Sequence, residues 1–340
     1  MPFHVIGATR DEVRAFMASL REPAYRADQL LRWVYVAGAA GFEAMTDMAK
    51  GLRTTLAERA VLHTASVAEV QCSRDGTRKL LVALEDGERV EAVVIPEGRR
   101  RTACVSTQVG CPVGCVFCAS GLDGLVRNLS AGEIVEQVLH ARRAVEPPAT
   151  LTNVVVMGIG EPLLNYDALL GALRILVAPW GLAMSPRRIT VSTVGIPDRI
   201  RQLAGEATGV NLAVSLHAAD DLTRRRLIPG ARPLAEVVAA ARHYLRSTGR
   251  EVTFEYALVR DVNDSLDDAR GLAELVGGED ILVNLLPLNR VTGLAWEEPP
   301  AARVERFAAE LQRRGVRAVR RRRRGDDIEG ACGQLRRGRR

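Results

Sequence analysis

The sequence is poor in aromatic residues and has no long apolar run. Phe, Trp and Tyr make up 4% of the 340 residues, so no platform of stacking rings like that of an RNA-recognition motif is visible. No apolar stretch approaches the ~20 residues that a membrane helix needs. The first residues become charged before an apolar segment develops, which does not fit a signal peptide. We therefore expect a cytoplasmic protein with no membrane partner.

Cysteine is also scarce, and its placement is more informative than its number. There are six cysteines, and three of them, Cys111, Cys115 and Cys118, fall within eight residues. Disulfide frameworks are typical of small secreted chains, and this chain is neither small nor visibly secreted. Close clustering of cysteines in a cytosolic chain indicates a metal centre or redox chemistry instead.

The remaining composition is that of an ordinary globular protein, with 47% apolar and 26% charged residues. The net charge is +6, and much of the basic excess lies near the end of the chain, in the Arg run 320–324 and the last residues. Such a run fits phosphate contacts with nucleic acid or a solvated basic surface. Charge alone does not decide between them.

Hydrophobic spacing divides the chain into three parts. Residues 1–65 have apolar residues three to four positions apart, which predicts a helical accessory domain. Residues 66–98 alternate between apolar and polar residues around DGTR and EDGE turns, which predicts a small β-sheet connector. Residues 99–340 alternate between strand-like and helix-like segments and end in a segment that carries Cys332.

The third part is expected to form an α/β barrel. Strands are predicted at 102–107, 153–158, 188–194, 210–216, 252–259 and 281–288, with helices at 131–145, 166–179, 197–204, 233–247, 266–277 and 302–315. Ser130 and Glu133 form a capping box at the first of these helices. This alternation predicts a parallel sheet with crossover helices. Six units fit a partial (β/α)6 barrel better than a closed eightfold one.

Polar motifs follow the predicted strands, where barrel enzymes place their reactive centres. The cysteine loop follows the first strand, GIGEPLLN the second, and STVG, SLHA and LPLNR end the third, fourth and sixth. The sequence therefore predicts that these motifs converge on one rim of the barrel.

The spacing Cys-x3-Cys-x2-Cys in CPVGCVFC brings three thiolates together on one loop. Three thiolates can ligate three irons of one [4Fe–4S] cluster and leave the fourth iron open. The amino and carboxylate groups of S-adenosylmethionine (SAM) suit an open iron, and a reduced cluster can break a carbon–sulfur bond of SAM. Structural zinc is the alternative, with Cys104 as a candidate fourth ligand, although Cys104 lies inside a predicted strand.

These motifs carry a family resemblance. CPVGCVFC and MGIGEPLLN resemble the radical SAM superfamily. Together with RNLSAGEIVEQV, STVGI, VSLHA, NRVTG and RGDDIEGACGQL, they resemble the RlmN/Cfr family of RNA adenine methyltransferases, and YRADQLLRWVY and FEAMTDMAKGLR resemble the accessory helical domain of RlmN. The resemblance covers residues from about 10 to about 335. RVTGLAWEEPP and the Arg run depart from the family pattern, which leaves RNA docking less defined than the chemistry.

The resemblance implies a role for individual residues. It implies that Cys111, Cys115 and Cys118 ligate the cluster. The implied SAM contacts are Gly160, Glu161, Ser192, Ser215, Leu216, His217 and Asn289.

The resemblance also implies a ping-pong reaction that uses two SAM molecules. The first SAM methylates the sulfur of Cys332, and the second gives a deoxyadenosyl radical that takes a hydrogen from this methyl group. The resulting carbon radical adds to the adenine ring. Cys104 then attacks the Cys332 sulfur, forming a disulfide and releasing the product, and Glu91 is the proton acceptor. Cys72 matches no functional position.

The function expected from this resemblance is methylation of carbon 2 of an adenosine in 23S rRNA, with certain tRNAs open as further substrates. A flavodoxin or ferredoxin is the expected electron donor, and a monomer is expected. One alternative is Cfr-like methylation at carbon 8, although RGDDIEGACGQL and the N-terminal helices favour carbon 2. A second alternative is a zinc-stabilised RNA-binding protein without catalysis, for which the distant pair Cys104 and Cys332 has no use.

Overall fold

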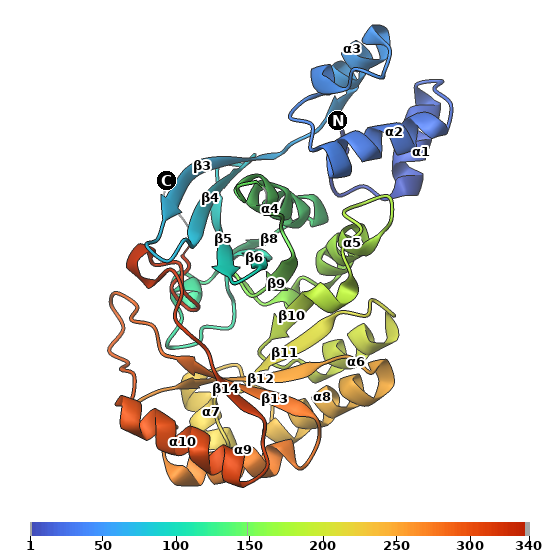
Figure 1. Ribbon diagram of the computed structural model, residues 1–340. Helices are drawn as coiled ribbons and strands as arrows, with labels where there is room; N and C mark the ends of the chain where they lie inside the picture. The colour runs from blue at the N-terminus through green and yellow to red at the C-terminus, as the bar shows by residue number, and fades with distance from the viewer. Residues whose placement is uncertain (1, 148, 337–340) are drawn as a thin grey trace.

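A ten-stranded sheet forms the centre of the computed structural model, which describes residues 2–147 and 149–336 (Figure 1). The strands lie in the order β14, β13, β12, β11, β10, β9, β6, β5, β4, β3. Their bounds are β3 Ala65–Cys72, β4 Arg78–Leu84, β5 Arg89–Glu97, β6 Arg100–Cys104, β9 Asn153–Val156, β10 Ile189–Thr193, β11 Asn211–Ser215, β12 Val252–Leu258, β13 Ile281–Pro287 and β14 Ala318–Arg320.

The part of the sheet from β6 to β14 is parallel, and helices connect its strands. These helices are α4 Ala131–Arg143, α5 Tyr166–Val177, α6 Pro197–Gly205, α8 Leu234–Thr248, α9 Leu266–Val276 and α10 Ala301–Arg313. Figure 1 shows them on the outer side of the curved sheet. The predicted partial barrel is confirmed, with the six expected strands at β6 and β9 to β13. The short strand β14 and the helix α7, Asp221–Leu227, were not predicted.

Strand β12 illustrates why the parallel sheet forms here. All seven residues of VTFEYAL are buried, as expected for a central parallel strand covered on both faces. The Tyr256 ring lies 5.4 Å from the ring of Phe307 on α10, which joins the sheet to its covering helix. Burying each of these aromatic side chains stabilises the fold by roughly 1.5–3 kcal/mol.

Helix α4 begins at the predicted capping box. The Ser130 hydroxyl accepts a hydrogen bond from the Glu133 amide, and the Glu133 carboxylate accepts one from the Ser130 amide. Arg127 pairs with the same carboxylate at 2.8 Å. The helix is buried from Gly132 to Ala141 because it packs between the sheet and the N-terminal part of the chain.

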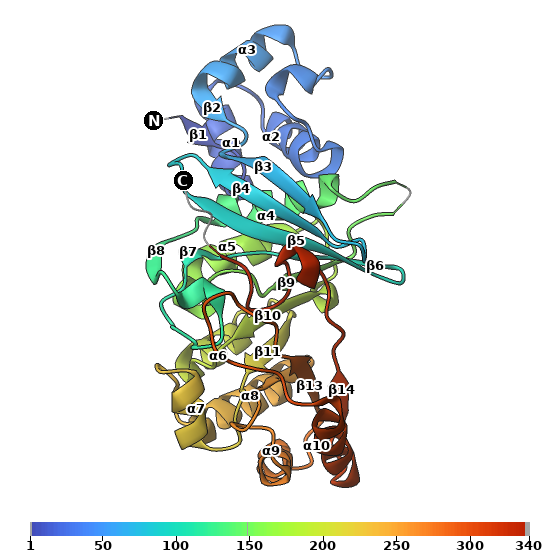
Figure 2. The ribbon, with the colours of Figure 1, turned by 90° about the vertical axis from the view of Figure 1, so that its left-hand side faces the viewer.

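Residues 66–98 form the antiparallel side of the barrel sheet. Strands β3, β4 and β5 are antiparallel to one another, and β5 pairs with β6, so that Val93 lies opposite Cys104 (Figure 2). Asp75 and Asp86 close the two hairpin turns by accepting hydrogen bonds from backbone amides two residues further along. The segment is thus continuous with the barrel through its hydrogen-bond ladder.

The N-terminal helices are α1 Arg10–Ser19, α2 Tyr25–Arg32 and α3 Lys50–Arg59, and they lie at one end of the molecule (Figure 1). A short parallel pair, β1 Phe3–His4 and β2 Ala60–Val61, joins the beginning and end of this part. The buried Glu136 of α4 accepts hydrogen bonds from the backbone amides of Thr64 and Ala65, at 2.8 and 3.0 Å.

Among the described residues, no helix is long and apolar enough to cross a membrane.

The C-terminal segment leaves β14 and crosses to the hairpin between β3 and β4 (Figure 2). The Gly325 amide donates to the Asp75 carboxylate at 3.0 Å, and the Asp327 carboxylate accepts from the Arg74 amide at 3.2 Å. These contacts anchor the segment that carries Cys332 over the open end of the barrel.

Candidate active site

The cysteine loop connects the two strands of a small hairpin, β7 Gln108–Gly110 and β8 Leu125–Asn128. The Cys111 amide donates to the Gly124 carbonyl oxygen at 3.0 Å, which closes the loop at its base. Gly110 has φ +80°, and a Cβ atom there would lie 1.9 Å from that same carbonyl oxygen. Only glycine therefore allows the loop to close directly before its first cysteine.

The three thiols of the loop line one cavity. Burial raises the pKa of all three, that of Cys111 to about 11, and backbone amides near Cys111 and Cys118 oppose this effect. Each thiol must therefore release a proton when it ligates a metal. Within the described residues, no three His, Cys, Asp or Glu side chains are placed to hold a single metal ion.

The cavity lies at the carboxyl ends of the strands and contains about 1080 Å³ of empty space, part of it open to solvent. It brings together most residues that the sequence had singled out. Those that line it are Cys111, Cys115, Cys118, Gly160, Glu161, Ser192, Ser215, His217, Asn289 and Cys332. Leu216, Cys104 and Glu91 lie outside the lining.

The glycine-rich segment after β9 places Glu161 in the cavity wall. The Glu161 carboxylate accepts hydrogen bonds from the amides of Leu163 and Val194, at 3.0 and 2.8 Å. Burial raises the pKa of Glu161 to about 6, although these hydrogen bonds act to lower it. Gly160 has φ +108°, and a Cβ atom there would lie 2.7 Å from the Cβ of Gln108, so the turn before Glu161 requires glycine.

Strands β10 and β11 end at the same cavity. Ser192 and Ser215 line it, whereas Leu216 is fully buried outside the lining, and its amide donates to the Glu255 carbonyl oxygen at 3.0 Å. His217 follows with φ +58°, and its Nδ1 accepts the Ala257 amide proton at 2.9 Å. Burial lowers the pKa of His217 to about 3, so the ring is neutral near pH 7. Its remaining proton therefore lies on Nε2.

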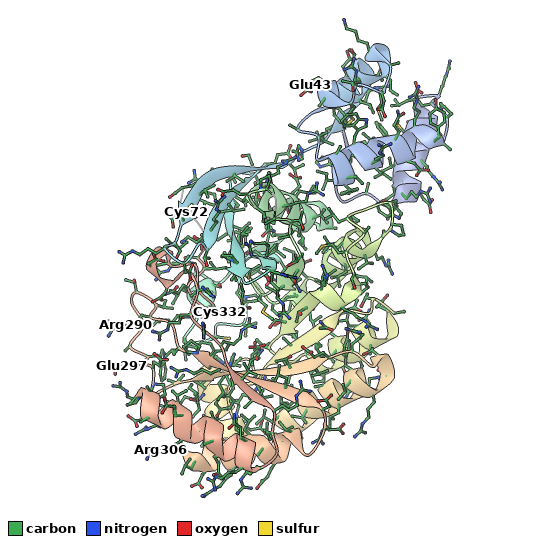
Figure 3. All side chains as sticks on the ribbon, viewed as in Figure 1. Glu43, Cys72, Arg290, Glu297, Arg306 and Cys332 are labelled. Atoms are coloured by element: carbon green, nitrogen blue, oxygen red, sulfur yellow. The ribbon has the colours of Figure 1, made fainter. Side chains whose placement is uncertain are left out.

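Residues from other parts of the chain hold the loop of Cys332 at the cavity by donating hydrogen bonds to its backbone carbonyl oxygens. The Asn289 amide donates to the Cys332 carbonyl oxygen at 2.9 Å, and the Ala119 amide donates to the Gly333 carbonyl oxygen at 2.7 Å. Ser120 donates from its hydroxyl to the Leu335 carbonyl oxygen at 2.8 Å. The cysteine loop and the Cys332 loop are therefore directly joined. Figure 3 shows Cys332 within the molecule.

The side chains of Cys104 and Cys332 interact electrostatically. Burial raises the pKa of the Cys104 thiol, and a charge on Cys332 raises it further. Cys104 is buried, whereas Cys332 is exposed towards the cavity, and all six cysteines are free. Cys72 is exposed on β3, at the outer side of the molecule (Figure 3).

Glu91 on β5 lies apart from the cavity lining. Its carboxylate pairs with Lys79 Nζ at 3.0 Å and accepts a hydrogen bond from the Arg336 amide at 2.8 Å. Both side chains of the ion pair are about nine-tenths buried. The C-terminal segment thus contacts the residue that the resemblance named as proton acceptor.

The cavity contains charged residues that the sequence analysis missed. Glu255 lines the cavity from β12 and accepts a hydrogen bond from Asn284 at 2.9 Å, and burial raises its pKa. Arg321 lines the cavity from the beginning of the C-terminal segment. A lone carboxylate inside the apolar strand VTFEYALV was the signal that could have identified Glu255.

Comparisons with known proteins agree with this geometry. Residues 3–62 match the family model of the ribosomal RNA large subunit methyltransferase N-terminal domain, and residues 105–274 match that of the radical SAM superfamily. The chain is 44% identical, over 99% of its own length and 91% of the relative, to a probable dual-specificity RNA methyltransferase RlmN of Rhodopirellula baltica. The chain belongs to the RlmN family of radical SAM RNA methyltransferases.

Two further relatives support this membership. A probable dual-specificity RNA methyltransferase RlmN of Thermus thermophilus is 49% identical over 92% of this chain and 88% of the relative. The crystal structure of a radical SAM methyltransferase from Sphaerobacter thermophilus has a TM-score of 0.96 and 45% identity, and covers 98% of this chain and 99% of that chain. The chain is therefore an enzyme, and the alternative of a binding protein without catalysis is wrong.

Proposed function

We propose that this enzyme methylates carbon 2 of an adenosine in 23S rRNA and in certain tRNAs, with Cys332 as the methyl carrier. The observation that carries the proposal is the placement of Cys332 in one cavity with three clustered thiols and within electrostatic range of Cys104. The matched large-subunit rRNA methyltransferase domain and the dual specificity in the relatives' names support the choice of RNA.

The residues of the cavity fit one [4Fe–4S] cluster and SAM. Cys111, Cys115 and Cys118 would hold the cluster, because they supply three thiolates from one closed loop. The buried Oδ1 of Asn289 has no hydrogen-bond partner among the described residues and lines the cavity, and it is therefore free to accept from a ligand. When bound and reduced by a flavodoxin or ferredoxin, the cluster supplies the electron that cleaves SAM.

The remaining proposed SAM contacts lie in the same cavity or next to it. Glu161 carries a carboxylate suited to an ammonium group, and Gly160 presents backbone beside it. Ser192, Ser215 and His217 offer polar groups at the ends of β10 and β11. Leu216 would act indirectly, because its backbone amide and carbonyl oxygen are bonded to Glu255 and Arg224. These groups would orient SAM and exclude water from the reacting atoms.

Cys332 accepts a methyl group on Sγ in the first half of the reaction. The bond between Sγ and the methyl carbon forms, the carbon–sulfonium bond of SAM breaks, and the thiol proton leaves to a base. Burial raises the pKa of this thiol, and the charge of Glu255 raises it further. Arg321 acts in the opposite direction and favours the thiolate that attacks.

Cys104 and Glu91 act in the second half. Once the carbon on Cys332 is bonded to the adenine ring, Glu91 takes the proton from ring carbon 2. A Cys104 thiolate then attacks Sγ of Cys332, and the old sulfur–carbon bond breaks. Its electron pair and a proton go to the carbon, which becomes the product methyl group, and the two cysteines remain as a disulfide. The unpaired electron that the radical addition brought into the adduct must also leave, and the cluster held by Cys111, Cys115 and Cys118 would accept it.

Trapping the covalent intermediate tests the proposal. Cys104→Ala keeps the methyl carrier but lacks the thiol that releases the product, so it should accumulate RNA attached to Cys332. Cys332→Ala should yield neither adduct nor product, and Cys72→Ala is the control because this cysteine is exposed on β3. The measurement is a denaturing gel followed by nuclease digestion and mass analysis. An adduct-free Cys104→Ala variant with wild-type turnover contradicts the proposal.

Methylation at carbon 8 is the second candidate, and mass mapping of the modified adenosine separates the two. The N-terminal match over residues 3–62 favours carbon 2. Comparing rRNA and tRNA with and without the enzyme identifies both the carbon and the RNA. A product methylated only at carbon 8 would reject the carbon-2 assignment and leave the Cys332 mechanism standing.

A further inference from the structure

Arg224 is a completely buried arginine on α7, directly behind the cavity. Its Nε donates to the Leu216 carbonyl oxygen at 3.1 Å, and one terminal nitrogen donates to the Arg232 carbonyl oxygen at 2.6 Å. The other terminal nitrogen donates to the carbonyl oxygens of Val194 and Ser215. The guanidinium is thus surrounded by backbone carbonyl groups.

No carboxylate within the described residues forms an ion pair with Arg224. Asp221, on the same helix, favours its charge only at longer range. Burial lowers the pKa of Arg224 to about 10, so the side chain still carries its charge near pH 7. Burying a cation without a counter-charge is strongly unfavourable, and carbonyl dipoles offset only part of this cost.

The helix that carries Arg224 also contacts the cysteine loop. The Val116 amide donates to the Leu227 carbonyl oxygen at 3.1 Å, and Leu227 packs in a small apolar cluster that includes Val113 and Phe117. Cys115 itself packs against the same apolar cluster, so the turn of α7 that follows Arg224 lies directly against the cysteine loop. An anion among the three thiolates would therefore lie within range of this cation.

We propose that Arg224 is the built-in counter-charge of the iron–sulfur centre and, at the same time, the residue that positions the ends of β10 and β11. The proposal rests on the proposed cluster at Cys111, Cys115 and Cys118. A four-iron cluster with three thiolate ligands is anionic, and reduction adds one negative charge. A fixed buried cation stabilises the reduced form more than the oxidised form, since the medium around it screens charge poorly. Arg224 therefore raises the reduction potential of the centre.

Three variants of the full chain test this role after anaerobic cluster reconstitution. Arg224→Met removes the charge, and Arg224→Lys keeps it without the planar fork. Arg225→Met is the matched control, because Arg225 is the next residue of α7 and is exposed. The measurement is the midpoint potential from a redox titration followed by electron paramagnetic resonance, with iron content determined in parallel.

The expected result is a more negative potential for Arg224→Met alone. A tenfold smaller equilibrium constant for reduction corresponds to ~59 mV for one electron, and we expect a shift of at least this size. Arg224→Lys should stay closer to the wild type, and Arg225→Met should match it. An unchanged potential in Arg224→Met at equal iron content overturns the proposal.

Loss of the cluster in Arg224→Met also gives a decisive outcome. If Arg224→Lys then retains four irons, the charge is what the centre requires, and the proposal stands. If both variants lose the iron while Arg225→Met keeps it, the hydrogen-bonding fork is what matters, and the counter-charge role is rejected. A wild-type protein that takes up no four-iron cluster would instead reject the proposed function itself.

Discussion

The side-chain amide of Asn289 donates a hydrogen bond to the backbone carbonyl oxygen of Cys332 at 2.9 Å, although 43 residues separate them in the sequence. The Oδ1 of the same side chain is buried at the cavity and has no partner among the described residues. One side chain thus holds the loop of the proposed methyl carrier and presents an acceptor to the cavity. We therefore expect Asn289 to couple the position of the Cys332 loop to the binding of a ligand in the cavity.

Substitutions at Asn289 separate these two contacts. Asn289→Asp keeps an acceptor and loses the donor to Cys332, whereas Asn289→Ala loses both. Leaving a buried partner without its hydrogen bond costs about 1–3 kcal/mol, so we expect SAM affinity to fall about tenfold in Asn289→Ala. Calorimetric titration of the cluster-loaded protein with SAM measures this. Equal affinities in wild type and Asn289→Ala would show that Oδ1 does not contact the ligand.

The buried ion pair between Lys79 and Glu91 makes a second prediction. Removing one partner of such a pair leaves an uncompensated buried charge, and we expect Lys79→Met to destabilise the fold by about 3–5 kcal/mol. The double variant Lys79→Met/Glu91→Leu should recover most of this loss, because both charges are then absent. Urea unfolding at equilibrium gives the coupling energy of the pair.

The exposed pair Arg260–Glu297 provides the control for this cycle. Its side chains are 42% and 54% exposed, so Arg260→Ala should change stability by less than about 1 kcal/mol. Additive effects of the Lys79 and Glu91 substitutions would mean that the pair is not formed in solution. Glu91 would then be free of Lys79 and available for proton transfer without rearrangement.

Much of the barrel could be predicted from the sequence because its signals are local. The capping box of Ser130 and Glu133 marks the start of α4, and continuous apolar segments such as VTFEYAL mark buried parallel strands. The cysteine spacing places three thiols on one loop whatever the rest of the chain does. The convergence of motifs at strand ends then follows from the topology.

Long-range pairing could not be predicted in the same way. Alternation in residues 66–98 predicts strands, but it does not reveal that β5 pairs with β6. The hairpin of β7 and β8 is too short to have a recognisable period. Arg224 gave no signal, because LTRRRL has the composition of an exposed helix and only the fold buries its third residue.

The five arginines of the run 320–324 have different environments in the folded protein. Arg323 donates to the Leu288 carbonyl oxygen and pairs with Glu298, Arg324 lies 3.9 Å from Asp75, and Arg321 lines the cavity. Arg320 and Arg322 are exposed and form no ion pair within the described residues. These two side chains are therefore the ones available for phosphate contacts.

Neutralising Arg320 and Arg322 together should reduce the salt dependence of RNA binding. Each lost phosphate contact lowers the slope of log affinity against log salt by about 0.7–0.9, so the double Gln variant should lose about 1.5. Arg306→Gln is the control, because this residue is exposed on α10, on the outside of the barrel (Figure 3). Filter binding of a radiolabelled rRNA hairpin at several salt concentrations gives the slopes. An unchanged slope would assign both arginines to a solvated surface.

His217 makes the pH dependence of stability predictable. Its pKa is about 3 in the folded protein, whereas an unfolded chain has a His pKa of about 6.5. Between these values the unfolded state binds a proton that the folded state excludes. The stabilisation is therefore fully present above about pH 6.5 and is lost as the pH falls towards 3, by up to roughly 1.4 kcal/mol per pH unit.

The matched variant is His217→Asn, because Asn tolerates the left-handed backbone at this position and its side-chain oxygen can accept the Ala257 amide proton. Glu161 acts with the opposite sign: its raised pKa of about 6 makes its contribution fall as the pH rises from about 4.5 through 6. This contribution is common to both proteins and cancels in their difference. The unfolding free energy of the wild type minus that of His217→Asn, measured in urea from pH 4 to pH 8, should be constant above pH 7 and fall steadily below pH 6. A difference that does not change with pH would mean that His217 is protonated in the folded protein or exposed to water.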